Sequence, residues 1–327
     1  MHIQPGTLGT TACALTGAVS LGAVGYCVYR LKDALGDRSV PLTAMMGSLV
    51  FAGQMVNFPI GAPVSGHLMG GVLAAIIAGP YAGCLAVALV LIVQCAMFAD
   101  GGLLELGANT LHMAVVGSLG GYAVYALTKR LFHDERVGTV VGAVVASWLT
   151  VMAAAALFCV EFTWSWAGDR PYDFQSIVAL MVSFHSLIGI GEALITGSVI
   201  AYVLRIQPDL IYSGTNVEAG RVRLGRTVVA GVVCALATAA FLAPFASSAP
   251  DGLEAVAQTS GFQESAQTSP ALFEDYAIPA LERRAGWQQI SVSVAGVGGT
   301  FAVLMIALVL GRCLKAASGP LPEVPCD

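Results

Sequence analysis

Long apolar runs separated by short polar stretches dominate this chain. Charged residues rarely interrupt the runs, and most runs could cross the roughly 30 Å hydrocarbon core of a bilayer as a helix of about 20 residues. We therefore predict an all-α polytopic membrane protein with about nine transmembrane helices. The expected spans cover residues 8–29, 41–58, two spans within 67–98, and then 109–128, 137–162, 175–204, 227–246 and 290–310.

One segment between two of these runs, residues 57–71, contains residues that helices avoid. Pro59 and Pro63 lack the amide proton that a continuing helix needs. Irregular backbone at membrane depth is tolerated only where protein buries it or where it lines a cavity. His67 stands at the end of this break, where we expect it to open the next helix. An ionisable group there is a candidate for function, and the alternative is a histidine bonded to a loop carbonyl group.

The run over residues 67–98 is interrupted at Gly79-Pro80, so it is either one kinked helix or two spans. Charge favours two spans, because cytoplasmic loops carry an excess of Lys and Arg. With two spans the N-terminus lies outside, the C-terminus is cytoplasmic, and the cytoplasmic loops hold 12 of the 15 Lys and Arg residues. These twelve residues are Arg30, Lys32, Arg38, Lys129, Arg130, Arg136, Arg205, Arg221, Arg223, Arg226, Arg312 and Lys315.

The start of the chain does not have the pattern of a secretory signal. Such a signal places positive charge before its apolar region and a cleavage site after it. Here the first seven residues are uncharged, and Arg30 and Lys32 follow the apolar run. We therefore expect the N-terminus to be retained.

Composition narrows the function further. The chain is 57% hydrophobic and 11% charged, whereas soluble domains carry about 25% charged residues. The net charge of −5 and the lack of a basic stripe argue against a nucleic-acid partner. The eight cysteines form no CxxC pair, so we expect neither a zinc site nor a disulfide framework. No GxxxxGK[ST] loop is present, so any ATP hydrolysis requires a partner protein.

Polar and turn-forming residues divide the chain into two expected parts. Residues 1–212 form a seven-helix part, and residues 213–226 form a cytoplasmic linker containing Ser213-Gly214-Thr215. Residues 227–327 form a two-helix part with an extracytoplasmic loop over residues 247–286.

The first two residues offer metal-binding chemistry. The α-amine of Met1, the amide nitrogen of His2 and its imidazole can close two fused chelate rings with three nitrogens in a plane. A fourth nitrogen completes a square-planar site that suits Ni(II) or Cu(II). His67 is the obvious fourth ligand, because both features lie on the outer side of the predicted topology. The alternative is that His2 belongs to an unstructured tail.

Several motifs, in order, resemble the CbiM/NikM family, the substrate-binding membrane subunits of energy-coupling-factor cobalt and nickel importers. These motifs are Met1-His2-Ile3, Asn57-Phe58-Pro59, the stretch from Ser65 to Gly71, Gly79-Pro80, Gln94, the stretch from Phe98 to Gly102, and the stretch from Leu106 to Asn109. The last third resembles the accessory subunit CbiN/NikN through Ala249-Pro250-Asp251-Gly252-Leu253-Glu254, Gly261-Phe262 and Asp275-Tyr276-Ala277-Ile278-Pro279. The chain thus looks like a fusion of the two subunits.

The resemblance implies a site and partners. It places the metal on Met1, His2 and His67, the set that the chemistry of the residues also nominates. It implies uptake of Ni²⁺ or Co²⁺ with no permanently bound cofactor, across the cytoplasmic membrane of a prokaryote. An integral coupling subunit (T subunit) and cytoplasmic ATPase subunits are the implied partners, so the chain is a transport subunit and not an enzyme. Nickel and cobalt are not distinguished.

Other polar residues in the apolar regions have two possible roles each. Asn57, Ser65 and Asn109 could support the metal site or satisfy the broken backbone. His112 follows Asn109 by about one helical turn, so it could share that face and also support the site. His185 and Glu192 lie two turns apart on one face of an expected helix, with a packing or a proton-linked role. Two other functions remain open: an ion-coupled secondary carrier using His185 and Glu192, and an intramembrane serine hydrolase using Ser65 and His67.

Overall fold

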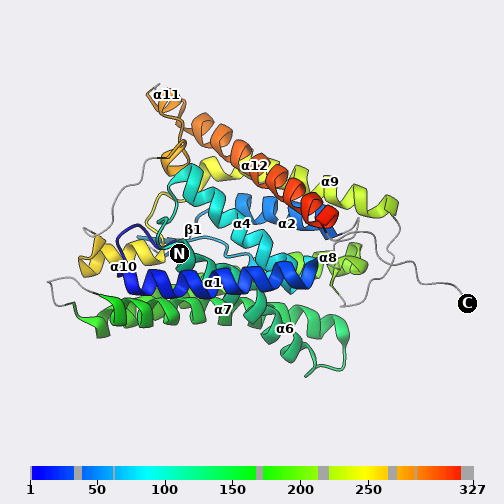
Figure 1. Cartoon of the computed structure of the whole chain (residues 1–327), viewed down its shortest axis with the longest axis horizontal. Coiled ribbons are helices and arrows are strands. Elements are labelled where there is room, and N and C mark those ends of the chain that lie inside the picture. Colours follow the sequence, from blue (N-terminus) through cyan, green and yellow to red (C-terminus); the bar gives the residue numbers. More distant parts are fainter. Residues whose placement is uncertain are drawn as a thin grey trace, which may run out of the picture.

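The computed structural model describes residues 2–32, 39–61, 63–166, 172–212, 221–263, 271–283 and 286–317. Helices dominate these residues, and most of the long ones run along one axis of the molecule (Figure 1). The predicted all-α membrane class is therefore confirmed, with one short hairpin as the exception.

The main helices of the first two-thirds of the chain are α1 (Thr10–Leu31), α2 (Ser39–Gln54), α3 (Gly71–Ala78), α4 (Pro80–Phe98), α5 (Leu106–Asn109), η1 (Thr110–Gly120), α6 (Gly121–Lys129), α7 (Glu135–Ser165) and α8 (Phe174–Ile206). The strands are β1 (Phe58–Gly61) and β2 (Val64–Gly66). The elements that follow are η2 (Pro208–Leu210), α9 (Arg221–Ala237), η3 (Thr238–Leu242), η4 (Ala243–Phe245), α10 (Gly252–Ser260), η6 (Glu274–Tyr276), α11 (Pro279–Glu282) and α12 (Gln288–Ala317).

Seven helices in the described part of the chain are long and apolar enough to cross a membrane. Helices α2 and α3 fall short of that length, with 16 and 8 residues. At 1.5 Å per residue, α3 extends only about 12 Å, less than half of the hydrocarbon core. The count of nine spans and the orientation therefore stay predictions.

The chain reverses between α3 and α4, as the two-span interpretation of residues 67–98 requires. Gly79 ends α3 and precedes α4 with φ 93° and ψ 156°, a conformation that is essentially restricted to glycine. Pro80 then begins α4, where its missing amide proton costs nothing. Beyond the turn, Gly83 packs against the backbone of Ala74 and Ala75, so the two helices lie side by side.

The broken segment folds as a hairpin, which the sequence did not predict. Strands β1 and β2 are antiparallel, with Pro59 opposite Ser65. The expectation that His67 opens a helix is wrong: residues 67–70 form neither helix nor strand, and α3 begins at Gly71. Gly70 sets this start, because its φ of 75° lies in the left-handed region that precludes a helix one residue earlier.

The last third of the chain packs against α2. Gly231 of α9 lies against Met45, and Gly299 of α12 lies against Phe51 of α2 and Phe98 of α4. A Cβ atom built on Gly299 would meet the Phe51 ring at 2.2 Å, so this crossing requires glycine. Helix α2 is consequently buried along most of its length between α3, α4, α9 and α12.

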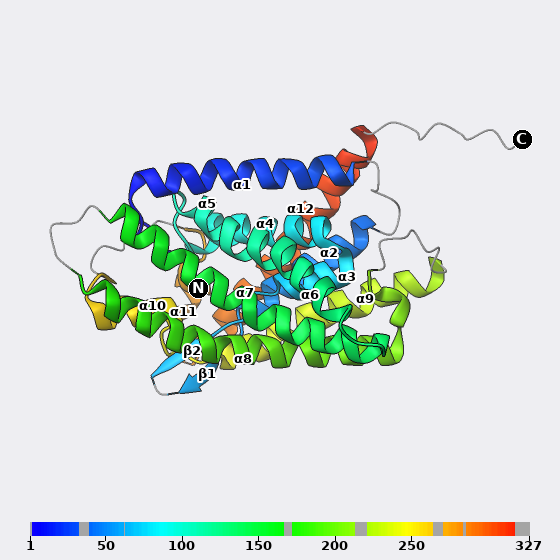
Figure 2. The same ribbon diagram turned by 90° about the horizontal axis from the view of Figure 1, so that it is seen from below.

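The two ends of the molecule differ in chemistry (Figures 1 and 2). One end, called here the histidine end, carries residues 2–9, the β1–β2 hairpin, residues 99–105 and α10. The opposite end, called here the cationic end, carries the C-terminal ends of α1, α6, α8 and α12 and the first residues of α7. Helix α9 also begins at this end, and the cationic residues there whose side chains the structure describes are Arg30, Lys32, Lys129, Arg130, Arg136, Arg205, Arg226, Arg312 and Lys315. Arg38 lies outside the described residues.

Candidate metal centre

The start of the chain folds into the histidine end, where two side chains hold its backbone. The Ile3 N–H donates to Asn109 Oδ1 at 2.8 Å, and Asn109 Nδ2 donates back to the Ile3 carbonyl oxygen at 3.3 Å. The Gly6 N–H donates to Glu105 Oε1 at 2.8 Å. Asn109 and Glu105 therefore position the N-terminal residues. Met1 lies outside the described residues.

The ring of His2 is buried, with 6% of the residue exposed, and polar atoms face both of its nitrogens. Nε2 lies 3.1 Å from Gln94 Oε1, and Nδ1 lies 3.2 Å from Asp100 Oδ1. Burial lowers the pKa of His2 to about 4, although the Asp100 carboxylate acts in the opposite direction. A neutral imidazole keeps a lone pair, which is the form that binds metals.

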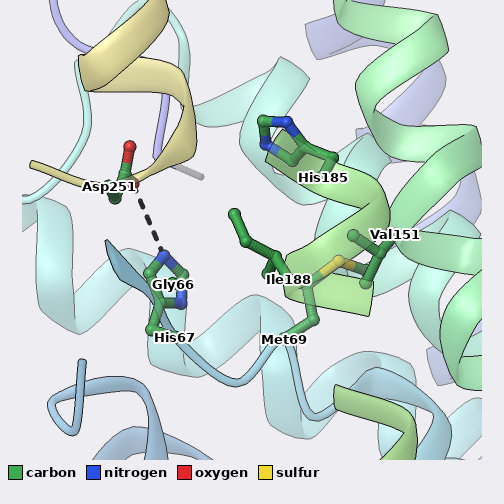
Figure 3. Close-up of a pocket in the computed structure, with 7 residues that line it drawn as sticks. All are labelled: Gly66, His67, Met69, Val151, His185, Ile188 and Asp251. Atoms are coloured by element: carbon green, nitrogen blue, oxygen red, sulfur yellow. Dashed lines mark ion pairs between the residues drawn. The ribbon is translucent and has the colours of Figure 1, made fainter. Parts of the chain in front are cut away.

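His67 lies beside His2. The two rings stack with centroids 5.2 Å apart and an interplanar angle of 24°. His67 Nδ1 is 3.1 Å from the Leu68 carbonyl oxygen, and Nε2 is 3.7 Å from Asp251 Oδ2 (Figure 3). The structure thus brings together two residues that are 65 positions apart in the sequence and that the chemistry of nitrogen ligands had nominated.

Side chains from two helices hold the backbone of the irregular residues after His67. Both oxygens of Glu192, in α8, accept backbone N–H groups: Oε2 from Met69 at 2.6 Å and Oε1 from Gly70 at 2.9 Å. Gln54, in α2, donates from Nε2 to the Met69 carbonyl oxygen at 3.0 Å. Of the two roles left open for Glu192, this geometry favours the structural one, since its carboxylate anchors the segment that carries His67.

The C-terminal part of the chain covers the hairpin. The Ser65 N–H donates to the Pro250 carbonyl oxygen at 2.9 Å, and Ser65 Oγ donates to the Ala249 carbonyl oxygen at 2.7 Å. The Asn57 carbonyl oxygen accepts from the Ser247 N–H at 2.8 Å. The Ser65 side chain and the backbone carbonyl group of Asn57 therefore link the two parts of the chain. The bond to Ala249 uses the only proton of the Ser65 hydroxyl group.

His185 approaches the same region from α8. It is fully buried; Nδ1 lies 2.9 Å from the Met181 carbonyl oxygen, and Nε2 has no hydrogen-bond partner. A small cavity of about 10 Å³, with room for about one water molecule, separates it from His67 (Figure 3). The residues that line this cavity are Gly66, His67, Met69, Val151, His185, Ile188 and Asp251.

His112 faces a different neighbour. Its Nε2 lies 3.0 Å from Glu161 Oε2 of α7, and both side chains are buried. The two atoms are close but do not meet hydrogen-bond geometry. Although His112 lies one turn after Asn109, the structure pairs it with α7, so it does not support the histidine pair directly.

Tyr276 completes the surroundings of His2 by joining Asp100 to Gln94. Tyr276 Oη donates to Asp100 Oδ2 at 2.6 Å and accepts from Gln94 Nε2 at 3.0 Å. Tyr276 belongs to a motif of the last third of the chain, but 182 positions separate it from Gln94, so the motif did not indicate that the two side chains meet. Gln94 appeared in a motif, but nothing in its surroundings in the sequence indicates that it faces His2.

Side chains alone do not build a metal centre here. Among the described residues, no three His, Cys, Asp or Glu side chains converge on one point. A metal at His2 and His67 therefore needs ligands from the backbone and the chain terminus, as the planar nitrogen arrangement supposes.

Comparisons with known proteins define the class. Residues 2–210 match the CbiM family, described as the cobalt uptake substrate-specific transmembrane region, and residues 225–316 match the PDGLE domain. The chain is 33% identical over 317 residues to a fused NikMN chain of Archaeoglobus fulgidus, covering 97% of this chain and 100% of that one. It is 33% identical over 221 residues to the fused nickel transport protein NikMN of Rhodobacter capsulatus, covering 64% of each chain. A crystal structure of a transition metal transporter shares 29% identity with a TM-score of 0.56, covering 63% of this chain and 93% of that one.

The fold and these matches define a helical membrane component of a transport system. The chain belongs to the CbiM family and carries a PDGLE domain in the same polypeptide, so the predicted resemblance and fusion are confirmed. It stands with transport proteins and not with enzymes.

Proposed function

We propose that this chain captures Ni²⁺ or Co²⁺ for uptake, as the substrate-specific membrane subunit of an energy-coupling-factor transporter. The proposed ligands are the α-amine of Met1, the amide and ring nitrogens of His2, and a ring nitrogen of His67. The stacked contact between the buried rings of His2 and His67, 5.2 Å between centroids, is the observation that carries the proposal.

The charges around the two rings support a bound cation. Asp100 lies beside His2, and Asp251 lies beside His67. A divalent ion bound to one deprotonated amide keeps a net positive charge, which the two carboxylates offset in a region of low dielectric constant. The nitrogen-rich set suits Ni²⁺ and Co²⁺ better than the oxygen-binding Mg²⁺ or Ca²⁺.

The energy source in this proposal is external to the chain. Because the sequence contains no phosphate-binding loop, an integral coupling (T) subunit and cytoplasmic ATPase subunits would drive transport. The cytoplasmic membrane of a prokaryote is the expected location. We assign metal capture to residues 1–212, the linker to residues 213–226, and the accessory role to residues 227–327 with their loop over 247–286.

Adding one residue before Met1 tests the proposed ligands. The extension moves the amine away from the His2 chelate, so the purified protein should lose stoichiometric nickel or cobalt, measured by elemental mass spectrometry. A matched protein with one residue added after Asp327 should keep its metal. Full retention of metal in the N-terminally extended protein would remove Met1 from the site.

The competing functions receive less support from the geometry. Ser65 donates its hydroxyl proton to a carbonyl oxygen, so His67 cannot accept that proton as a hydrolase base would. Both carboxylate oxygens of Glu192 bind backbone N–H groups, which argues against a mobile proton carrier. Metal uptake that persisted in cells lacking the partner ATPase would nevertheless favour the secondary carrier.

A further inference from the structure

Three side chains form a closed ring of contacts with the imidazole of His2. His2 Nδ1 lies 3.2 Å from Asp100 Oδ1, and Asp100 Oδ2 lies 2.6 Å from the Tyr276 hydroxyl oxygen. That oxygen lies 3.0 Å from Gln94 Nε2, and Gln94 Oε1 lies 3.1 Å from His2 Nε2, which closes the circuit. Gln94 lies in α4, and Asp100 lies two residues after the end of that helix. Tyr276 belongs to the PDGLE domain. The C-terminal domain therefore contacts the candidate ligand His2 through two intermediaries.

The directions of these hydrogen bonds are fixed by simple accounting. An ionised carboxylate only accepts, so the single proton of Tyr276 goes to Asp100. Burial and the Asp100 charge raise the pKa of Tyr276 well above its ordinary value, so the phenol keeps this proton. Its oxygen then accepts from the Gln94 amide nitrogen, which turns the Gln94 oxygen toward His2. That oxygen can only accept, so the His2 proton belongs on Nε2.

This tautomer leaves the lone pair on Nδ1, opposite the Asp100 oxygen at 3.2 Å. Two electron-rich atoms at this distance attract each other only through a proton or a cation between them. Nδ1 is also the ring nitrogen that closes a six-membered chelate with the amide nitrogen of the same residue. The arrangement thus presents to a metal the nitrogen that the proposed chelate needs.

We propose that Tyr276 is a positioning residue that orients Gln94 and Asp100 and so holds His2 in the tautomer that binds metal through Nδ1. The inference rests on the proposed function. It assigns to the PDGLE domain a defined part in building the site: its tyrosine selects the protonation pattern of a ligand on the other domain.

The local structure around Tyr276 is built to hold its side chain. Asp275 and Tyr276 both adopt the left-handed region, with φ of 53° and 58°, which is uncommon for residues other than glycine. Strained backbone of this kind persists where the surrounding structure fixes it, and it is concentrated at functional sites. The Tyr276 ring stacks on Phe98 with centroids 4.6 Å apart, which leaves its hydroxyl group directed at Asp100 and Gln94.

The test uses the full chain with its natural N-terminus, in detergent micelles. Tyr276→Phe removes only the hydroxyl group and keeps the ring on Phe98. Tyr172→Phe is the matched control, since Tyr172 packs through its ring on Phe162 and Trp166 at the same end of the molecule. Two quantities are measured: Ni²⁺ affinity by competition with a chelator, and the tautomer of His2 in metal-free protein by ¹⁵N NMR, its signals assigned with a His2→Gln variant.

We expect Nε2–H in the wild type, a mixture of tautomers in Tyr276→Phe, and a loss of Ni²⁺ affinity of about 10- to 100-fold, as for other residues that orient a metal-binding histidine. Tyr172→Phe should match the wild type. An Nδ1–H tautomer in the wild type overturns the inference even if the variant does not fold. Lost affinity with an unchanged tautomer also overturns it, because the role is then only structural. A wild type that binds no Ni²⁺ or Co²⁺ refutes the proposed function instead.

Discussion

Glu192 shows how one buried side chain can fix a distant loop. A carboxylate in a membrane helix is expensive unless it is paired, and here two backbone N–H groups of residues 69 and 70 provide the compensation. One of these bonds satisfies the N–H of Gly70, the N-cap residue of α3, which a helix start leaves without a partner in the helix. The Glu192 carboxylate and the irregular segment at residues 69–70 therefore stabilise each other. His67 lies two residues before Met69, the first residue that Glu192 binds.

Replacing Glu192 by Gln should destabilise the protein. One oxygen would become an NH₂ group facing a backbone N–H, so one donor loses its partner at a cost of about 1–3 kcal/mol. Denaturant titration in micelles, followed by tryptophan fluorescence, measures this change. Glu135→Gln is the control, since the Glu135 side chain is 83% exposed and its pair with Lys129 is worth less than about 1 kcal/mol. Equal effects of the two substitutions would show that the anchor is unimportant.

Asn109 makes a second testable contact, with the backbone of Ile3. Asn109→Ala removes both hydrogen bonds, each worth about 1 kcal/mol, so the chain start should become less ordered and Ni²⁺ affinity should fall by about tenfold. Competition with a chelator measures the affinity. Gln175→Ala, which removes an exposed amide group, should leave the affinity unchanged. An unaltered affinity in Asn109→Ala would mean that the order of residues 2–9 does not limit binding.

At the scale of elements, the sequence predicts where helices are interrupted but not which structure forms at each interruption. Proline and glycine affect the conformation of their own backbone, so the residue types at Pro59, Pro63 and Gly79-Pro80 are enough to predict that helices stop there. The hairpin at residues 58–66 depends on partners such as Pro250, which no local pattern indicates. The site divides in the same way. His2 and His67 were predicted from ligand chemistry and family resemblance, whereas Gln94 and Tyr276 become neighbours only through tertiary packing.

Gly79 gives the clearest test of an element boundary. Its conformation is nearly exclusive to glycine, and a Cβ atom would lie 2.9 Å from the Tyr212 ring. Gly79→Ala should therefore lower the free energy of unfolding by about 1–3 kcal/mol. Gly22→Ala in α1 is the matched control: no atom lies within 4 Å of its new Cβ, and helix propensity favours alanine by up to about 1 kcal/mol. If both variants were stabilised, the reversal at Gly79 would not depend on glycine.

For the whole molecule, the two sequence domains form one packed body at the histidine end. The C-terminal domain places Asp251 beside His67 and Tyr276 beside Asp100, while α12 covers α2 through Gly299. Fusion in one chain fixes the two domains at a high effective concentration, so these contacts need no separate binding step.

Orientation in the membrane is the remaining property of the whole molecule, and charge predicts it. Most of the described cationic residues collect at one end, with Arg283 after α11 as an exception, and the candidate metal centre lies at the other. Because cytoplasmic segments are enriched in Lys and Arg, the histidine end should face outward, where it meets extracellular metal. In a variant whose native cysteines are replaced, a membrane-impermeant maleimide added to intact cells should label Gln258→Cys in α10 and spare His133→Cys, which follows α6. Both positions are exposed, so solubilised protein should be labelled equally at either one. The opposite pattern in intact cells would place the metal centre inside and exclude capture from outside.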